Sequence, residues 1–206
     1  MAGRITRLNL IVFVTVAIAG CSASAPARFY TLESTALPQA APVAPEAVMV
    51  GPVSVPAEVD QPQVVVQVAP NRVEVEDFDR WAAPLSDGIA RAIAGDLATE
   101  LGTPDVVTAP AANFDPAYQV TIDVQRFESI RGQAALVEAV WTVRRIAGGY
   151  TRIGRTVARE AVQGDGFDAL AAAHSRALAR VSGDIATAIR MGPPHSPSDG
   201  TARIPQ

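Results

Sequence analysis

Residues 118–125 read YQVTIDVQ and residues 137–144 read VEAVWTVR, and in both stretches apolar side chains alternate with polar ones. This period of two is typical of β-strands that bury one face and expose the other. Arg131-Gly132 lies between the two stretches and suits the turn of a hairpin. The pattern therefore predicts a pair of antiparallel strands.

A third strand is predicted to follow over residues 151–162, after a turn at Gly148-Gly149. Its faces are not cleanly apolar or polar, because hydrophobic and basic side chains share one parity. These side chains are Ile153, Arg155, Val157 and Arg159. A strand of this kind is typical of a sheet edge or of a subunit contact.

Two helices are predicted, one before these strands and one after them. In the first, an apolar residue recurs every four residues from Leu85 to Leu101, so that one side of the helix packs. Gly102 suits the end of this helix. The second helix opens after Gly164-Asp165-Gly166, with Asp165 as its N-cap.

The part of the chain before the first helix also predicts strands. Residues 48–55 contain Gly51-Pro52, which favours an edge strand or a bulged one. Residues 63–68 and 72–76 are rich in valine and flank Pro70-Asn71, a hairpin signal. Further upstream, the short aromatic island Phe29-Tyr30-Thr31-Leu32 is expected to return and pair with the domain.

The order of these elements predicts an α+β fold. We expect a single domain over residues 48–191, with a mostly antiparallel sheet and two main helices packed on one of its faces. Residues 192–206 follow Met191 with glycine, prolines and polar residues, and are predicted to be a disordered tail.

The N-terminus resembles the signal peptide of a bacterial lipoprotein. Arg4 and Arg7 precede a 12-residue apolar stretch, which is too short to span a bilayer. Ile18-Ala19-Gly20-Cys21 then resembles a lipobox, in which the thiol becomes a thioether to diacylglycerol. The alternative is a plain signal peptide that ends near a cysteine by chance.

The lipobox predicts cleavage after residue 20 and lipid attachment at Cys21, with acyl chains such as palmitate as the membrane anchor. The residue after Cys21 is Ser22 and not an aspartate. This resembles the signal for export to the outer membrane. Residues 21–47 are then the lipidated N-terminus and an Ala/Pro-rich, flexible tether.

The composition excludes several classes of protein. A net charge of −4, which becomes −6 without residues 1–20, argues against a nucleic-acid-binding protein. One cysteine excludes a disulfide framework and a multi-cysteine metal site. The chain has no nucleophile elbow, zinc-protease motif or phosphate-binding glycine loop. We therefore expect no enzyme activity, no cofactor and no metal ion.

Two aromatic residues have unassigned roles. His174 and Ser175 are neighbours on a helix, so their side chains point about 100° apart and cannot act together. His174 falls on the apolar stripe, which predicts a hydrogen-bonded histidine at the core boundary. Trp81 is equally consistent with a core residue and with a partner contact.

Charge is distributed unevenly along the domain. Residues 48–123 hold three arginines and 12 acidic residues, whereas residues 124–191 hold 10 arginines and six acidic residues. Five arginines bracket the predicted turn at Gly148-Gly149 and form a candidate partner-binding set: Arg144, Arg145, Arg152, Arg155 and Arg159. The set indicates either an ordinary solvated hairpin or a contact with a second copy, an acidic partner or lipid headgroups.

Several motifs, in this order and spacing, resemble those of the ABC-type transport auxiliary lipoproteins, the PqiC-like family. They are Phe29–Leu32, Val50–Pro56, Asn71-Arg72-Val73, Phe78–Leu85, Tyr118-Gln119-Val120, Trp141 and Gly164-Asp165. The resemblance covers nearly the whole mature chain to about residue 191. It rests on the set of motifs rather than on any single one.

The resemblance implies a non-enzymatic, lipid-anchored protein on the periplasmic side of the outer membrane. It would work beside an MCE-domain periplasmic protein and an inner-membrane transporter in moving lipids and maintaining the outer membrane. An alternative is a structural or regulatory outer-membrane lipoprotein that acts on a cell-wall synthase or on envelope assembly. A lipoprotein hydrolase is a third hypothesis, and it requires a nucleophile and a base side by side.

Overall fold

The computed structural model describes residues 25–38, 46–110, 112 and 114–192. The elements follow in the order β1 (Arg28–Tyr30), β2 (Val48–Ser54), β3 (Gln63–Ala69), β4 (Arg72–Trp81), α2 (Leu85–Leu101), β5 (Val106–Val107), β6 (Tyr118–Ile130), β7 (Ala134–Arg145), β8 (Thr151–Ala161) and α3 (Gly166–Met191). The predicted signal peptide, Cys21 and the tail lie outside the described residues.

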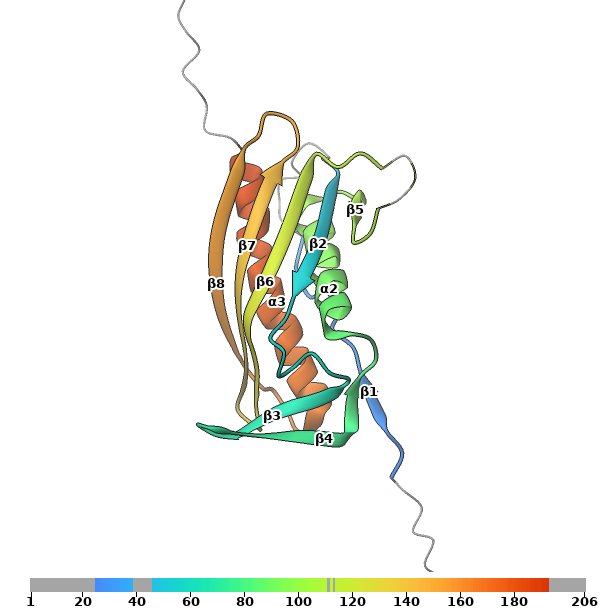
Figure 1. Cartoon of the computed structure of the whole chain (residues 1–206), viewed down its shortest axis with the longest axis vertical. Helices are drawn as coiled ribbons and strands as arrows, with labels where there is room; N and C mark the ends of the chain where they lie inside the picture. Colours follow the sequence, from blue (N-terminus) through green and yellow to red (C-terminus); the bar gives the residue numbers. More distant parts are fainter. Residues whose placement is uncertain (1–24, 39–45, 111, 113, 193–206) are drawn as a thin grey trace, which may run out of the picture.

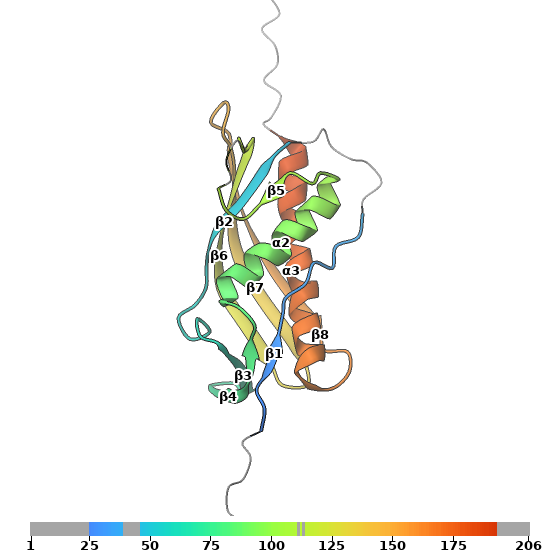
Figure 2. The same ribbon diagram turned by 90° about the vertical axis from the view of Figure 1, so that its right-hand side faces the viewer.

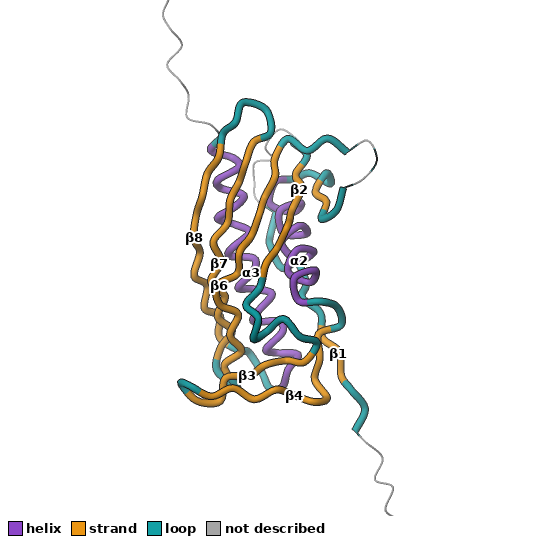
Figure 3. The backbone as a smooth tube through the Cα atoms, viewed as in Figure 1, coloured by secondary structure: helices purple, strands orange, loops and turns teal. Residues whose placement is uncertain are grey.

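The fold is α+β, as predicted, with two layers (Figure 1). The long strands β2, β6, β7 and β8 form a curved sheet, and both helices cover the same face of it (Figure 2). The β3–β4 hairpin turns away from the long strands and lies across one end of the domain (Figure 3). Among the described residues, no helix combines the length and the hydropathy needed to cross a bilayer.

The predicted hairpins are confirmed. β6 and β7 pair antiparallel from Tyr118–Arg145 to Ile130–Ala134, and β7 pairs antiparallel with β8. β3 and β4 form the other predicted hairpin. β2 and β3, by contrast, both pair parallel with β6, β2 along its first half and β3 at its last residues. These parallel pairs arise because the chain crosses over through α2 before it returns to the sheet.

β2 has the predicted bulge but is not a free edge. Its register with β6 shifts between Val50 and Val53, around Gly51-Pro52. The other side of β2 pairs with the two-residue strand β5 at Val48 and Met49. β5 therefore covers only the beginning of β2, the strand for which the sequence predicted an edge or a bulge.

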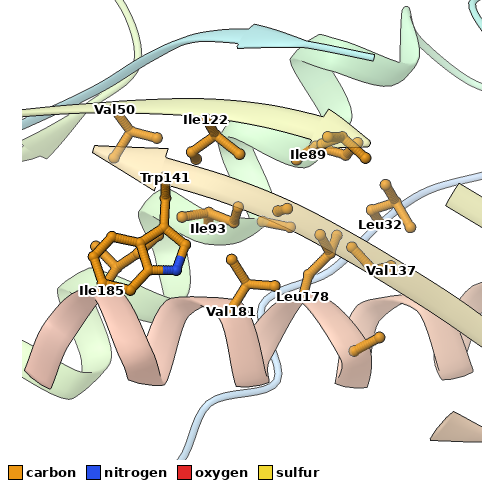
Figure 4. Close-up of a cluster of buried hydrophobic side chains, with 14 of the residues drawn as sticks. Leu32, Val50, Ile89, Ile93, Ile122, Val137, Trp141, Leu178, Val181 and Ile185 are labelled. Carbon is orange, nitrogen blue, oxygen red and sulfur yellow. The ribbon is translucent and has the colours of Figure 1, made fainter. Parts of the chain in front are cut away.

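The core lies between the helices and the sheet (Figure 4). The helices contribute the fully buried side chains Ile89, Ile93, Leu97, Leu178, Val181 and Ile185. The sheet contributes Val50, Ile122, Val137 and Trp141, which come from its alternating positions. The spacing of four in α2 and the period of two in β6 and β7 thus meet in one apolar layer.

The helix ends follow their sequence signals in part. Gly102 adopts the left-handed conformation, and its N–H donates to the carbonyl of Ala98. Asp165 occupies the N-cap position of α3 in an extended conformation, but its side chain makes no capping hydrogen bond. The first turn of α3 is therefore not capped in the way that the sequence predicted.

The aromatic island before the Ala/Pro-rich segment belongs to the domain, as predicted. β1 pairs parallel with the last three residues of β4, from Arg28–Asp79 to Tyr30–Trp81. The predicted tether, residues 21–47, therefore does not lie wholly outside the domain. Residues 32–36, which follow β1, contact the helices, so they cannot set the distance between Cys21 and the domain.

Candidate functional site

The carboxylate of Asp79 holds β1 in place. Its Oδ2 accepts a hydrogen bond from Arg28 Nη2 at 2.7 Å, and its Oδ1 accepts one from the Tyr30 hydroxyl at 2.6 Å. Burial alone raises the pKa of Asp79, but these two bonds outweigh it and hold the pKa below its ordinary value. Burial and the bond to Asp79 raise the pKa of Tyr30 to about 12.

The segment that follows β1, residues 31–36, is called here the strap, and Asp96 on α2 fastens it. Asp96 is fully buried. Its Oδ1 accepts hydrogen bonds from Ser34 Oγ at 2.8 Å, Thr35 N at 2.8 Å and Ala36 N at 2.9 Å. Its Oδ2 accepts a bond from Ser182 Oγ on α3 at 3.0 Å. One carboxylate thus joins the strap to both helices.

Glycines on α2 leave room for the strap. A Cβ atom on Gly95 would lie 2.8 Å from Ser34 Cβ, closer than real side chains approach. A Cβ atom on Gly88, two turns earlier on the same helix, would lie 3.6 Å from Leu32 Cδ1, an ordinary contact. Sequence reasoning missed both Asp79 and Asp96, and Gly95-Asp96 within an apolar helix was the available signal.

β8 is an edge strand, as its mixed pattern predicted. Among the described residues it pairs with β7 alone. Its odd-numbered side chains face away from the helices and include Ile153 and Val157, which are 69% and 53% exposed. A strand of 11 residues that has a neighbour on one side alone and exposes apolar side chains is typical of a surface that meets another protein.

The structure separates the five arginines predicted as a partner-binding set. Arg144, Arg155 and Arg159 are exposed on the face of the sheet that the helices do not cover, and Arg155 donates to Glu138 Oε1 at 2.7 Å. Arg145 contacts Glu46 at 3.3 Å, and Arg152 donates to Met191 Sδ at 2.9 Å. Three members of the set therefore share a face with Ile153 and Val157.

The inner face of β8 is occupied by a tryptophan. The indole of Trp141 lies against Gly154, directly opposite it on the neighbouring strand. Trp141 Nε1 donates to Thr156 Oγ1 at 2.9 Å, and Thr156 donates to Asp184 on α3 at 2.6 Å. These contacts explain why a glycine and a threonine stand on the inner face of β8.

His174 is buried in the core rather than at its boundary. Its ring stacks on Phe127 with 3.9 Å between centroids, and Trp81 meets it edge-on at 6.1 Å. Nε2 lies 2.9 Å from Ser129 Oγ, while Nδ1 has no hydrogen-bond partner among the described residues. Burial lowers the pKa of His174 to about 3, so the ring is neutral at physiological pH. Trp81 is likewise a core residue.

The described residues do not bring together a recognisable catalytic or metal centre. No group of three potential metal ligands occurs within them. A cleft of about 260 Å³ runs beside the strap, and one of about 600 Å³ opens between the β3–β4 and β6–β7 turns. Side chains fill the space between the sheet and the helices. The candidate functional features are therefore on the surface: the strap, the edge strand β8 and the turns at the two ends of the sheet.

Comparisons with known proteins agree with this picture. The sequence model of the ABC-type transport auxiliary lipoprotein component matches residues 30–186. No curated protein matches the chain.

Solved structures share the fold. The crystal structure of an uncharacterized protein is 19% identical and has a TM-score of 0.66, with 80% of this chain and 99% of that chain covered. Protein XCC0632 from Xanthomonas campestris is 22% identical and has a TM-score of 0.62, with 77% and 92% covered. At these identities the likeness is one of fold.

Proposed function

The chain belongs to the family of ABC-type transport auxiliary lipoprotein components, and on that premise we propose that it is a non-enzymatic auxiliary component of an MCE-type lipid transport system at the bacterial outer membrane. Lipid attachment at Cys21 holds it there, with the domain in the periplasm. The match over residues 30–186 carries this proposal, because it runs from Tyr30, the last residue of β1, through β2 to β8 and α2 and ends within α3.

A filled core supports a docking role rather than a carrying one. A protein that carries lipid must shelter acyl chains, because each exposed methylene costs about 0.8 kcal/mol. The space between the sheet and the helices is occupied by side chains such as Ile93, Trp141 and Val181. The domain therefore suits a fixed attachment point for the proteins that conduct the lipid.

The Ser129–His174 pair does not support the hydrolase hypothesis. The two side chains are hydrogen-bonded, but Ser129 is 2% exposed and His174 is fully buried. A general base works best with a pKa near the working pH, and the pKa of His174 is about 3. No carboxylate bonds to Nδ1 among the described residues. The pair thus acts as a packed, neutral part of the core.

The exposed side of β8 is the surface that we assign to partner proteins. It combines Ile153, Val157, Arg155 and Arg159 of β8 with Arg144 of the neighbouring strand β7, which shares this face. Apolar side chains supply contact area, and the cations select an acidic neighbour. That neighbour is the MCE-domain protein or the acidic first half of a second copy.

The proposal is tested by isolating the protein from its own cell envelope and identifying what comes with it. We expect an MCE-domain protein and its transporter subunits with the native chain. Cys21→Ala should release the protein from membranes, whereas Ser22→Ala should leave it attached. A Cys21→Ala variant that still sediments with membranes would refute the anchor. Recovery of cell-wall synthases without an MCE-domain protein would favour the alternative function.

A further inference from the structure

The chain enters the domain at one defined end. β1 begins beside the β3–β4 hairpin in both views of the molecule (Figures 1 and 2). β3 pairs with β6 only at the last residues of β6, Ser129 and Ile130, next to the β6–β7 turn. The end of the domain that is formed by β1, the β3–β4 hairpin and the β6–β7 turn is called the hairpin end. The opposite, far end carries the β7–β8 turn, where Ile146 N donates to Ala117 O.

Covalent geometry limits how far the hairpin end can lie from the anchor. Arg28 lies seven positions after Cys21, and a fully extended chain of that length spans at most roughly 25 Å. The 13 residues of β6 separate the two ends by roughly 40 Å, at about 3.3 Å per residue. A domain that rested on the membrane with its far end would place Arg28 beyond the reach of Cys21.

The hairpin end exposes apolar side chains on the strands that face the anchor. Phe29 on β1 is 64% exposed, and Phe78 on β4 is 43% exposed. They lie on one face of the β1–β4 pair, because Phe29 pairs with Arg80, two residues after Phe78. Val73 and Val75 are also exposed on the hairpin.

Charge at this end is largely balanced within the end itself. Arg28 is paired with Asp79, and Arg131 on the β6–β7 turn is paired with Glu74 and Glu76. Neutralised carboxylates do not repel a surface that carries phosphate groups. The attraction to such a surface then comes from the apolar side chains rather than from a basic patch.

We propose that the hairpin end rests on the phospholipid surface, with Phe29, Phe78, Val73 and Val75 in the headgroup region and the far end held away from the membrane. This inference rests on the proposed anchor at Cys21. It gives the domain one orientation, in which the β7–β8 turn points into the periplasm. In this orientation the protein contacts the membrane twice, through the acyl chains on Cys21 and through the apolar side chains of the hairpin end.

The test uses the lipidated full chain in vesicles of phosphatidylethanolamine and phosphatidylglycerol. Acylation consumes the single native thiol, so a cysteine introduced elsewhere is the only site for an environment-sensitive fluorophore. We would label Phe78→Cys at the hairpin end and Ile146→Cys at the far end. These positions are matched, since they are 43% and 44% exposed. Val73→Cys provides a second reporter at the hairpin end.

Lipids with a quencher near the headgroup should extinguish the fluorophore at positions 78 and 73 and leave the one at position 146 unchanged. Equal quenching at both ends, or quenching at position 146 alone, would overturn the orientation. Flotation of each labelled protein with the vesicles is recorded in the same samples. Failure to float would instead refute the anchor, and with it the orientation, so the two failures are distinguishable.

Discussion

Gly154 lies directly beneath the indole of Trp141, and the two residues are paired across β7 and β8. A Cβ atom at this position would overlap the six-membered part of the ring. The contact lets a large side chain lie flat between the edge strand and α3, with its Nε1 bonded to Thr156. The ring of Trp141 thus packs against the inner face of the edge strand, which is also paired with β7 and bonded to α3 through Thr156.

Gly154→Ala is expected to destabilise the domain, because the indole must move or the strand must separate. Overpacking of this kind costs typically about 1–3 kcal/mol in the free energy of unfolding. Urea titration followed by tryptophan fluorescence measures it. Gly183→Ala on α3 is the control, since its Cβ would meet Glu100 Oε1 at 3.5 Å and cause no overlap. Equal stability of the two variants would contradict the packing.

Gly95→Ala and Gly88→Ala should have opposite effects, although both lie on α2. Alanine at 95 pushes Ser34 away, so the amides of Thr35 and Ala36 should lose their protection against hydrogen exchange. Alanine at 88 has room, and it should raise stability by up to about 1 kcal/mol through its higher helix propensity. Unchanged protection of Thr35 in Gly95→Ala would show that the strap is not held as described.

Stability should fall as the pH drops below 6.5, and His174 should account for it. The folded pKa of about 3 lies below the unfolded value of 6.5, so the stabilisation is complete above 6.5 and is lost progressively toward 3. Between pH 6.5 and 5 the loss is about 2 kcal/mol, at 1.36 kcal/mol per unit. The measurement is urea unfolding at several pH values.

His174→Asn is the comparison for that experiment. Its amide can still bond to Ser129, but it does not titrate. The slope between pH 6.5 and 5 should nearly vanish in this variant, whatever its absolute stability. A slope equal to that of the native protein would assign the pH dependence to other groups.

Asp79→Asn should loosen β1 and change the acid limb of the stability curve. The pKa of Asp79 is lowered in the fold, so its contribution is present above the ordinary aspartate pKa near 3.8 and is lost as the pH falls through the folded value. The variant should lose less stability than the native protein below pH 4. Asp87→Asn, on the exposed side of α2, should leave that limb unchanged.

Much of the fold follows from local pattern. The period of two in β6 and β7, together with the Arg131-Gly132 turn, predicted the central hairpin, and the spacing of apolar residues in α2 predicted its buried side. Local pattern could not show that β2 and β3 both align parallel with β6, because that pairing depends on a crossover through α2.

The strap shows a contact that the composition of its segment does not indicate. Alanine and proline after Leu32 are typical of a linker, yet three donors of Ser34, Thr35 and Ala36 converge on Asp96, about sixty residues later. Gly95-Asp96 within an apolar helix is a local signal of a buried polar contact, but it does not identify the segment that makes the bond. The five arginines are divided for a related reason, since neighbours in sequence alternate between the two faces of a strand and only three of the five share one face.

The parallel pairing of β1 with β4 also determines how the domain bears mechanical load. A pull on the chain before Arg28 runs along the axis of β1 and strains its hydrogen bonds to β4 in shear, so that they must yield together rather than one after another. Beyond β1 the same load reaches the strap, and Asp96 passes it to α2 and α3. Tension from the proposed anchor at Cys21 would thus act first on β1 and the strap, and through Asp96 on the two helices.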